Sequence, residues 1–233
     1  MKTRLSAFLA SLLAFAGCVY AQRSSADQPF TKTERAVFNE PWAMSFLPGS
    51  GLPITSMALV TEKAGRLLLV DTATGQVTSV AGVPVVADGG QGGLGDVVAD
   101  SDFAGNQQIW LSWVESGAGG FGAVVGRARL VLGKAPHLEG LAVVWRQDKT
   151  SGSGHFGHRL AFAPDGSLFV SSGERQKFDP AQDLKTNLGK IIRIVPGALP
   201  QIWSMGHRNP LGLAFDGGGR LWEIEMGRWV AMS

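Results

Sequence analysis

The sequence has one cysteine, Cys18, among its 233 residues. That cysteine lies in an N-terminal segment with the pattern of a secretory signal. The domain that follows therefore has no pair for a disulfide and no thiolate to hold a metal. Charged residues are also scarce, at 17 % of the chain, whereas hydrophobic residues make up 45 %. This balance indicates a globular protein.

Several motifs are absent as well. The net charge is only +2 and there is no lysine run, so nothing supports nucleic-acid binding. No Gly-x-Gly-x-x-Gly fingerprint links a strand to a helix, which argues against a dinucleotide-binding Rossmann domain. The chain also lacks a Gly-x-Ser-x-Gly elbow and any His/Cys/Asp cluster with the spacing of zinc or iron ligands. These absences leave few of the common enzyme classes.

The N-terminus has the order of a secretory signal. Lys2 and Arg4 precede an apolar run over 5–21 that ends in Val-Tyr-Ala, with small residues where a signal peptidase reads. The run is too short and too rich in small residues for a membrane span. We expect 1–21 to be a signal peptide and the protein to be periplasmic or secreted. An N-terminal anchor, a buried helix, or a lipoprotein modified at Cys18 are the alternatives.

Residues 22–35 are polar and mixed, which predicts a linker before a domain over 36–233. Glycine is abundant, with 32 residues, and short apolar runs separated by turns predict an all-β fold. One unit recurs in the domain: an apolar strand, a turn, and a second apolar strand. We assign these pairs to 41–48 with 66–71, 94–98 with 108–114, 159–166 with 167–173, and 212–216 with 220–225.

The first strands of these pairs end at Phe46, Val98, Phe162 and Phe215, with spacings of 52, 64 and 53 residues. A period of about 50 residues is typical of the four-stranded blades of a β-propeller. Further strands are expected between the pairs, and about four blades in all. An irregular β-sandwich is the alternative. The remaining expected elements are outer strands at 123–132, 141–147 and 190–195, a hairpin turn at Asp165-Gly166, and a short helix or loop over 179–188.

Two residues are candidates for acid–base chemistry. His155 follows a Ser-Gly-Ser-Gly segment and precedes a first strand, in a loop that a propeller would place at its central channel. A neutral histidine there can take a proton from a substrate hydroxyl. Glu174 follows the next strand, so a hairpin would bring it beside His155, where a carboxylate fixes the tautomer. The alternatives are an ordinary loop histidine and a solvated acid paired with Arg175.

Two further segments are candidates for binding. Gln91 lies between pairs of glycines that let a ligand approach the backbone closely, although a flexible loop without a role is equally compatible. Arg208 and Asn209 place a cation and an amide side by side, a pair suited to stabilising charge on a carbonyl oxygen. Alternatively, Asn209 caps a turn and Arg208 packs on Trp203.

Other notable residues favour structural roles. His158 and His207 are interpreted as structural histidines. The aromatic residues predicted to pack against the sheets are Trp42, Trp110, Trp113, Trp145 and Trp203.

Taken together, the motifs resemble those of one family. They are Gly-Gly-Gln-Gly-Gly-Leu-Gly-Asp around Gln91, His-Phe-Gly-His-Arg-Leu-Ala-Phe from His155, Ser-Ser-Gly-Glu-Arg through Glu174, Asn-Leu-Gly-Lys-Ile-Ile-Arg over 187–193, and Gly-His-Arg-Asn-Pro-Leu-Gly through Asn209. In order and spacing they are similar to the soluble quinoprotein sugar dehydrogenases of the glucose/sorbosone dehydrogenase family, from about residue 41 to residue 227.

This resemblance implies a six-bladed β-propeller that binds pyrroloquinoline quinone and calcium and oxidises the anomeric hydroxyl of aldoses to lactones. It implies that His155 is the catalytic base, paired with Glu174, and that Gln91 contacts the sugar. Arg208 and Asn209 would contact the quinone carbonyls, with Arg208 also stabilising charge during hydride transfer. The carbonyl of Gly227 would belong to the calcium loop. The aldose, the electron acceptor and whether the protein forms a homodimer stay open.

The sequence departs from the family pattern after Gly227, where Arg-Trp-Val-Ala-Met-Ser replaces a proline and a glycine- and acid-rich loop. About two blades of the six, with later cationic residues, are then missing, so we expect a truncated, poorly soluble chain that is inactive with the quinone. The alternatives to a dehydrogenase are a non-catalytic binding propeller and a metal-dependent sugar-lactone hydrolase.

Overall fold

The computed structural model of the chain describes residues 29–48 and 56–227. By its internal contacts the chain divides into two units, 1–34 and 35–233. Of the first unit, residues 29–34 are described, and they are exposed and form no helix or strand. The expected signal peptide, Cys18 and most of the expected linker lie outside the described residues. Within the described residues, no helix has the length and hydropathy needed to cross a membrane.

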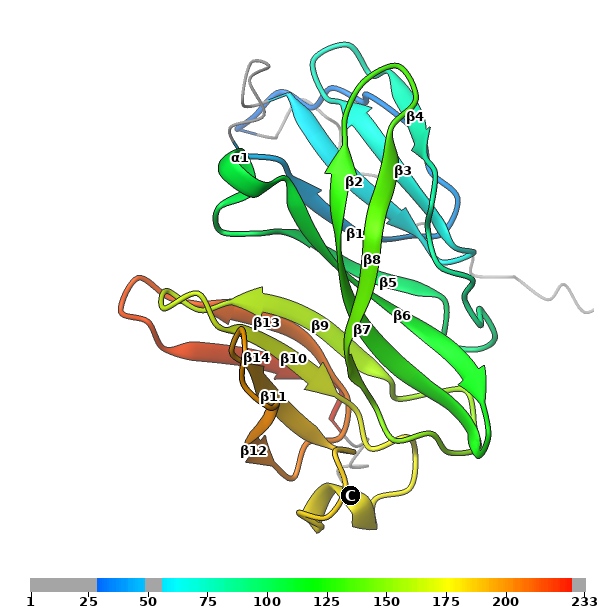
Figure 1. Ribbon diagram of the computed structural model, residues 1–233, viewed down its shortest axis with the longest axis vertical. Coiled ribbons are helices and arrows are strands. Elements are labelled where there is room, and N and C mark those ends of the chain that lie inside the picture. The colour runs from blue at the N-terminus through cyan, green and yellow to red at the C-terminus, as the bar shows by residue number, and fades with distance from the viewer. Residues whose placement is uncertain (1–28, 49–55, 228–233) are drawn as a thin grey trace, which may run out of the picture. The chain divides into compact units, whose positions relative to one another are not determined.

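The second unit consists of antiparallel sheets whose strands follow one another in chain order (Figure 1). Three sheets have four strands each and a fourth has two. The first contains β1 (Pro41–Phe46), β2 (Met57–Glu62), β3 (Arg66–Asp71) and β4 (Val77–Val80). The second contains β5 (Leu94–Ala99), β6 (Gln108–Gly117), β7 (Gly120–Val131) and β8 (His137–Arg146). The third contains β9 (Gly157–Phe162), β10 (Leu168–Ser172), β11 (Lys190–Ile194) and β12 (Gln201–Met205), and the last β13 (Pro210–Phe215) and β14 (Leu221–Glu225).

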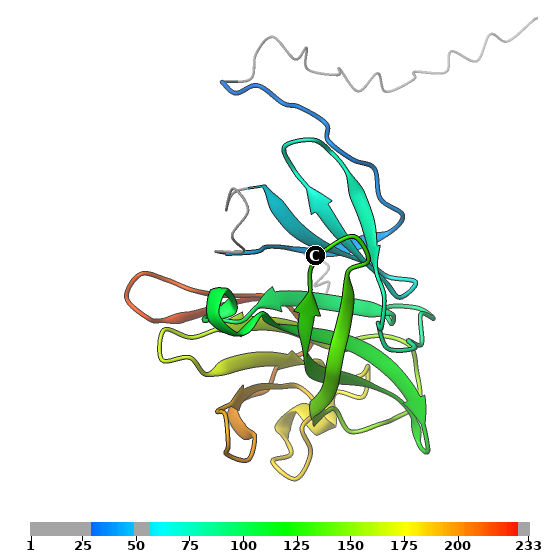
Figure 2. The ribbon, with the colours of Figure 1, turned by 45° about the horizontal axis from the view of Figure 1, so that its top comes forward.

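The first strand of each sheet packs against the first strand of the next, so that β1, β5, β9 and β13 form a continuous series (Figure 2). Sequential four-stranded sheets joined through their first strands are the blades of a β-propeller. The predicted fold is therefore confirmed as a partial propeller. Among the described residues, two short helices interrupt the loops: α1 (Phe103–Asn106) and the 3₁₀ helix η2 (Asp179–Gln182). The second lies within 179–188, where a short helix or a loop was expected.

One strand pairing was predicted wrongly. The strand at 66–71 does not pair with β1, because β2 lies between them and pairs with both. Both β2 and β3 are apolar and almost wholly buried, so neither shows the alternation that reveals a strand's partner. The three residues between them form a tight turn in which Gly65 has φ +98°. The other three predicted pairs are confirmed as neighbouring strands.

Two layers of the hydrophobic core lie between neighbouring sheets, and a smaller third cluster lies on the first sheet beneath Phe38. Leu59 and Leu67 of the first sheet meet Leu111 of the second, while Trp110 of the second meets Val170 of the third. Alternate residues of β6 thus enter opposite layers, which explains its unbroken buried run. Each fully buried leucine contributes roughly 1.5–3 kcal/mol. The second sheet, covered on both sides, is the centre of the folded unit.

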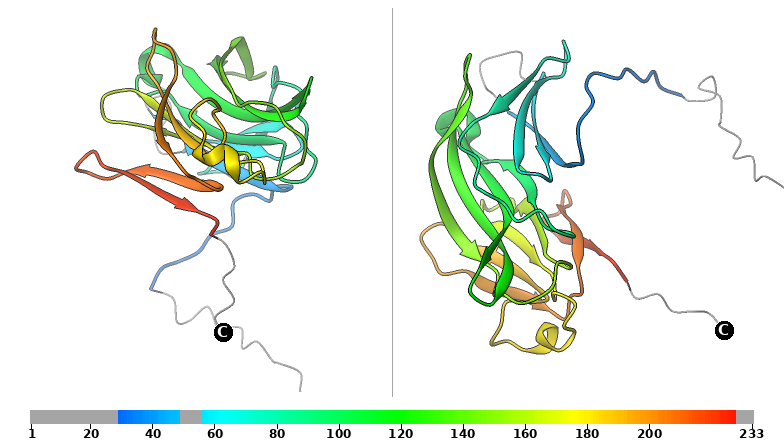
Figure 3. Two further views of the ribbon diagram at one scale, coloured as in Figure 1. Left: turned by 90° about the horizontal axis from the view of Figure 1, so that it is seen from below. Right: turned by 90° about the vertical axis from the view of Figure 1, so that its right-hand side faces the viewer.

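The outer face of the last hairpin differs from this arrangement. In β14 the burial alternates, with Trp222 and Ile224 exposed between partly buried neighbours. Figure 3 (left) shows the hairpin with one face turned away from the other sheets. The period-two pattern of this strand is therefore that of a sheet packed on one face.

Candidate functional site

The candidate site lies where loops from successive sheets meet. Gln91 lies between β4 and β5, His155 between β8 and β9, and Arg208 and Asn209 between β12 and β13. These three loops each join the last strand of one sheet to the first strand of the next. Glu174 comes from the β10–β11 loop. The repeated topology therefore brings residues more than one hundred positions apart to one end of the inner strands.

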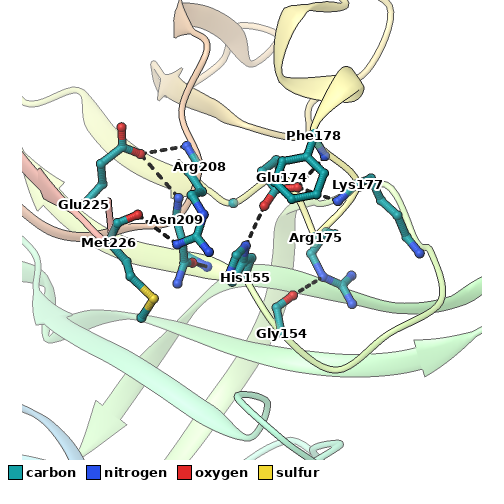
Figure 4. Close-up of polar contacts among 12 residues, drawn as sticks. Gly154, His155, Glu174, Arg175, Lys177, Phe178, Arg208, Asn209, Glu225 and Met226 are labelled. Carbon is teal, nitrogen blue, oxygen red and sulfur yellow. Dashed lines mark hydrogen bonds and ion pairs between the residues drawn. The ribbon is translucent and has the colours of Figure 1, made fainter. Parts of the chain in front are cut away.

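His155 and Glu174 form a buried pair (Figure 4). The ring Nδ1 of His155 lies 2.5 Å from Oε1 of Glu174. The backbone of His155 has φ +53°, an uncommon value for a residue with a side chain, which turns the ring toward the acid. With Nδ1 engaged, Nε2 is the ring atom left to accept a proton. No hydrogen bond to Nε2 is found within the described residues.

Glu174 is held as a carboxylate. Burial alone would raise the pKa of its carboxyl, but the hydrogen bonds it accepts outweigh burial and lower that pKa below the ordinary value. The donors are the backbone N–H of Phe178 at 2.7 Å, the His155 ring, and the backbone N–H of Lys177. An ionised Glu174 stabilises a positive charge on His155. The alternative of a solvated acid paired with Arg175 is wrong, because Glu174 is buried and its oxygens face other donors.

Arg175, considered from the sequence only as an alternative partner of Glu174, fixes the loop before His155. Its guanidinium donates to the carbonyls of Gly154 at 2.9 Å, Gly152 at 2.6 Å and Phe121 at 2.5 Å. It also lies 3.8 Å from the centre of the Phe156 ring. Burial lowers its pKa to about 10, which leaves it charged at neutral pH. The buried guanidinium thereby holds the backbone of this glycine-rich segment, which forms no helix or strand, in one conformation.

Gln91 contacts the same loop from the other side. Its Oε1 accepts a hydrogen bond from the His155 backbone N–H at 2.7 Å, and its own N–H donates to Ser153 O at 2.7 Å. Gly90 before it has φ +60°, and a Cβ there would lie 2.4 Å from Ser153 O. The glycine is therefore required for the close approach of the two loops.

A cavity of about 290 Å³ adjoins these residues. Gln91, Lys63, Asn209 and Trp42 contribute to its lining. Trp42 was predicted to pack against the sheets. It does so by stacking on His158 of β9, with ring centres 4.9 Å apart, and it also lines the cavity. The lining combines an apolar wall with a few polar groups, as small-molecule sites do.

Arg208 and Asn209 present donors that no group of the described residues uses. Asn209 is fully buried, and its Oδ1 accepts from the Gly157 N–H at 3.1 Å, while Nδ2 has no partner. The buried Nε of Arg208 also lacks a partner. Buried donors without acceptors are costly, so two on adjacent residues fit an electron-rich ligand such as a quinone carbonyl. The predicted pair thus fits the cofactor that the family resemblance implies.

Glu225 positions this pair. Its Oε2 accepts the backbone N–H groups of Arg208 at 2.7 Å and Asn209 at 3.3 Å (Figure 4). The Arg208 Nη1 donates to the carbonyl of Met226 at 2.9 Å and that of Gly227 at 3.4 Å. Gly227, the predicted calcium ligand, is therefore next to the site, with its carbonyl turned toward the Arg208 guanidinium. Sequence reasoning missed Glu225, although a carboxylate on the strand opposite the Arg-Asn turn was the signal available.

The chain matches the family model of the glucose/sorbosone dehydrogenases over residues 38–229. It is 34 % identical to aldose sugar dehydrogenase YliI of Escherichia coli K12 over 229 residues, covering 91 % of this chain and 59 % of that protein. It is 25 % identical to quinoprotein glucose dehydrogenase B of Acinetobacter calcoaceticus, covering 81 % of this chain and 46 % of that protein.

Solved structures agree with this relationship. A glucose dehydrogenase crystal structure matches with a TM-score of 0.73 at 38 % identity, covering 81 % of this chain and 58 % of that one. The PQQ-bound aldose sugar dehydrogenase of Streptomyces coelicolor matches with a TM-score of 0.72 at 30 % identity, covering 82 % and 58 %. The chain thus spans roughly half to three fifths of these relatives' length. From its sequence and its fold, the chain belongs to the glucose/sorbosone dehydrogenase family.

Proposed function

We propose that this chain carries the residues that accept the substrate proton in a quinoprotein aldose dehydrogenase. Such an enzyme oxidises the C1 hydroxyl of an aldose to a lactone. The observation that carries the proposal is the buried His155–Glu174 pair beside two unpartnered donors from Arg208 and Asn209. Pyrroloquinoline quinone, when bound, supplies the acceptor for the C1 hydride. The protein's own groups hold the sugar, remove its proton and stabilise charge.

In this proposal Nε2 of His155 accepts the proton of the C1 hydroxyl. Glu174 keeps the proton of the resting ring on Nδ1 and stabilises the imidazolium that forms, in the manner of a buried acid behind a histidine base. The amide of Gln91, whose Nε2 has no hydrogen bond within the described residues, donates to a sugar hydroxyl. Its Oε1 meanwhile holds the His155 backbone.

The cofactor would be bound by the donors of Arg208 and Asn209. Calcium would draw on backbone carbonyls at Gly227, because a hard cation of this kind takes oxygen ligands. Calcium takes about six to eight oxygen ligands, so water and the cofactor's carboxylates would supply the others. Periplasmic or secreted location is part of the same proposal and is supported by the basic and apolar pattern of residues 1–21.

The experiment has two stages. Pyrroloquinoline quinone is first titrated into the chain with calcium present, with tryptophan fluorescence reporting binding. Glucose-dependent reduction of a dye is then measured. We expect Arg208→Ala to weaken quinone binding. We expect His155→Ala to leave it unchanged. Inactivity with the quinone is the expectation for this chain, and dye reduction tests it; any turnover that is measured should fall by about 10²–10⁴-fold in His155→Ala, the usual contribution of a general base.

The control is His137→Ala, which removes an exposed histidine of the second sheet. Quinone binding that ignores Arg208→Ala would contradict the assignment of the donors. Turnover that ignores His155→Ala would contradict the assignment of the base. Hydrolysis of a sugar lactone without added quinone would instead favour the hydrolase alternative.

A further inference from the structure

A cluster of ligand-type side chains lies next to the Arg208–Asn209 turn, and it includes Glu225, which positions that turn. His207 comes from the β12–β13 loop, and Glu223 and Glu225 come from β14. Two residues apart on a strand, the glutamates share one face. Their neighbours Trp222 and Ile224 occupy the opposite, exposed face. The two carboxylates therefore face the His207 loop.

The ligand atoms of the three residues all lie within 4.8 Å of one another. His207 Nδ1 and Glu223 Oε1 lie 3.8 Å apart, too far for a hydrogen bond. The other ring nitrogen, Nε2, lies 2.7 Å from Ser204 Oγ, a contact that orients the ring with Nδ1 toward the carboxylates. Outer contacts of this kind usually orient a metal-binding histidine.

The carboxylates keep oxygens available. Oε2 of Glu223 is buried and has no hydrogen-bond partner. Glu225 uses Oε2 to accept the backbone N–H groups of the next turn, and no hydrogen bond to its Oε1 is found in the described part of the chain. A buried carboxylate oxygen without a donor is costly. A cation placed between the three residues would satisfy it.

The charge of the cluster is also uncompensated. Two carboxylates this close repel each other, and no lysine or arginine of residues 29–48 and 56–227 forms an ion pair with either. The ligands are one nitrogen and two carboxylate oxygens, and imidazole favours zinc and its neighbours over calcium.

The spacing is close to that of a metal centre. Zinc bonds of about 2.0–2.2 Å in a tetrahedral site hold the ligand atoms about 3.4 Å apart. Side-chain rotations that move the ligand atoms by roughly 1 Å would therefore complete the site.

We propose that His207, Glu223 and Glu225 bind one divalent transition-metal ion of the zinc class, with water in the remaining position. Such an ion would tie β14 to the loop that presents Arg208 and Asn209. It is separate from calcium at Gly227, because it depends on an imidazole and on side-chain carboxylates.

The test is calorimetric titration of the tag-free chain with zinc chloride, without quinone. We expect one ion per chain. We expect His207→Ala and Glu223→Gln each to weaken binding by at least tenfold. His137→Ala is the matched control, since His137 also pairs with a glutamate, Glu139 at 3.3 Å, but lacks a second carboxylate. The His137→Ala variant should bind zinc as tightly as the unchanged chain does.

NMR resonances of the histidine rings, followed while zinc is added to the unchanged chain, test the proposal without any variant. Zinc should shift those of His207 and leave those of His155 and His158 in place, because these two rings are buried. The proposal is overturned if zinc does not bind the unchanged chain. It is equally overturned if binding survives both His207→Ala and Glu223→Gln, or if the shifts fall on His137 instead.

Discussion

His158 links the stability of the protein to pH. The ring is fully buried, stacks on Trp42 and lies with Nδ1 2.9 Å from Ser112 Oγ. Room for it exists because residue 95 is glycine, where a Cβ would lie 2.0 Å from the ring. Burial, with help from the charges of Arg159 and Arg175, lowers the pKa of His158 from 6.5 to about 3. The folded protein therefore keeps this ring neutral, as its expected structural role requires.

The sign of the resulting effect follows from proton binding. The unfolded chain binds a proton at His158 as the pH falls through 6.5, whereas the folded chain does so only near pH 3. Stability is thus lost as the pH falls between these values. From pH 7 to pH 5 we expect this group to cost about 2 kcal/mol.

The measurement is urea unfolding at pH 7 and pH 5 for the unchanged chain and for His158→Gln. The variant has no ring to protonate, so its stability should fall by about 2 kcal/mol less over the same interval. An equal fall in both proteins would show that His158 does not carry the linkage.

At the candidate site, the sequence predicted some residues and missed others for a physical reason. His155 and Glu174 flank the β9–β10 hairpin. Their proximity could be predicted because the two strands of a hairpin bring its flanking residues together. The roles of Arg175 and Glu225 depend on carbonyls and N–H groups of other loops, more than ten residues away in sequence. Contacts of this kind have no period or spacing, and only the folded chain reveals them.

At the scale of the elements, Gln147 connects two sheets. It follows β8, and its buried side chain accepts from the Ala123 N–H at 3.1 Å. Its Nε2 lies within hydrogen-bonding distance of the carbonyls of Phe156 and Gly173 and of Ser172 Oγ at 2.8 Å. One amide thus joins β7 of the second sheet to Phe156, next to His155, and to the end of β10 in the third sheet.

Removing this amide should destabilise the fold. Gln147→Ala leaves several buried polar groups without partners, each worth about 1–3 kcal/mol, and we expect a loss of about 2–4 kcal/mol. Chemical denaturation measures it. Gln76→Ala, at an exposed glutamine outside the strands, is the control and should change stability by less than about 0.5 kcal/mol. Equal effects of the two substitutions would contradict the role of Gln147.

The strands themselves were predictable to different degrees. The ends of β1, β9 and β13 at Phe46, Phe162 and Phe215 followed from the repeated first-strand pattern. The pairing of β2 did not, because a strand buried on both faces has no alternation to show which neighbour it faces. Residue periodicity thus located strands and blades, whereas the order within the first blade required the structure.

At the scale of the whole molecule, the series of sheets leaves apolar side chains uncovered at both of its described ends. Met44 and Phe46 are exposed on β1, and Trp222 and Ile224 on β14. The second sheet differs, because each of its faces meets a neighbouring sheet in a core layer. Across from Trp222 and Ile224, the small residues Ala214 and Gly212 leave these two side chains protruding. Exposed apolar patches of this kind promote association.

We therefore expect this chain to self-associate through the outer face of β14. Ile224 is 76 % exposed, and Ile224→Thr keeps a β-branched residue while removing apolar surface. The variant should bind less of a hydrophobic dye and shift toward monomer in light scattering coupled to size-exclusion chromatography. Val85→Thr is the matched control, since Val85 is 93 % exposed but lies outside the strands. Association that persists in Ile224→Thr, or that Val85→Thr reduces equally, would show that the self-association surface lies elsewhere. The exposed apolar residues of β1 would then be the next to substitute.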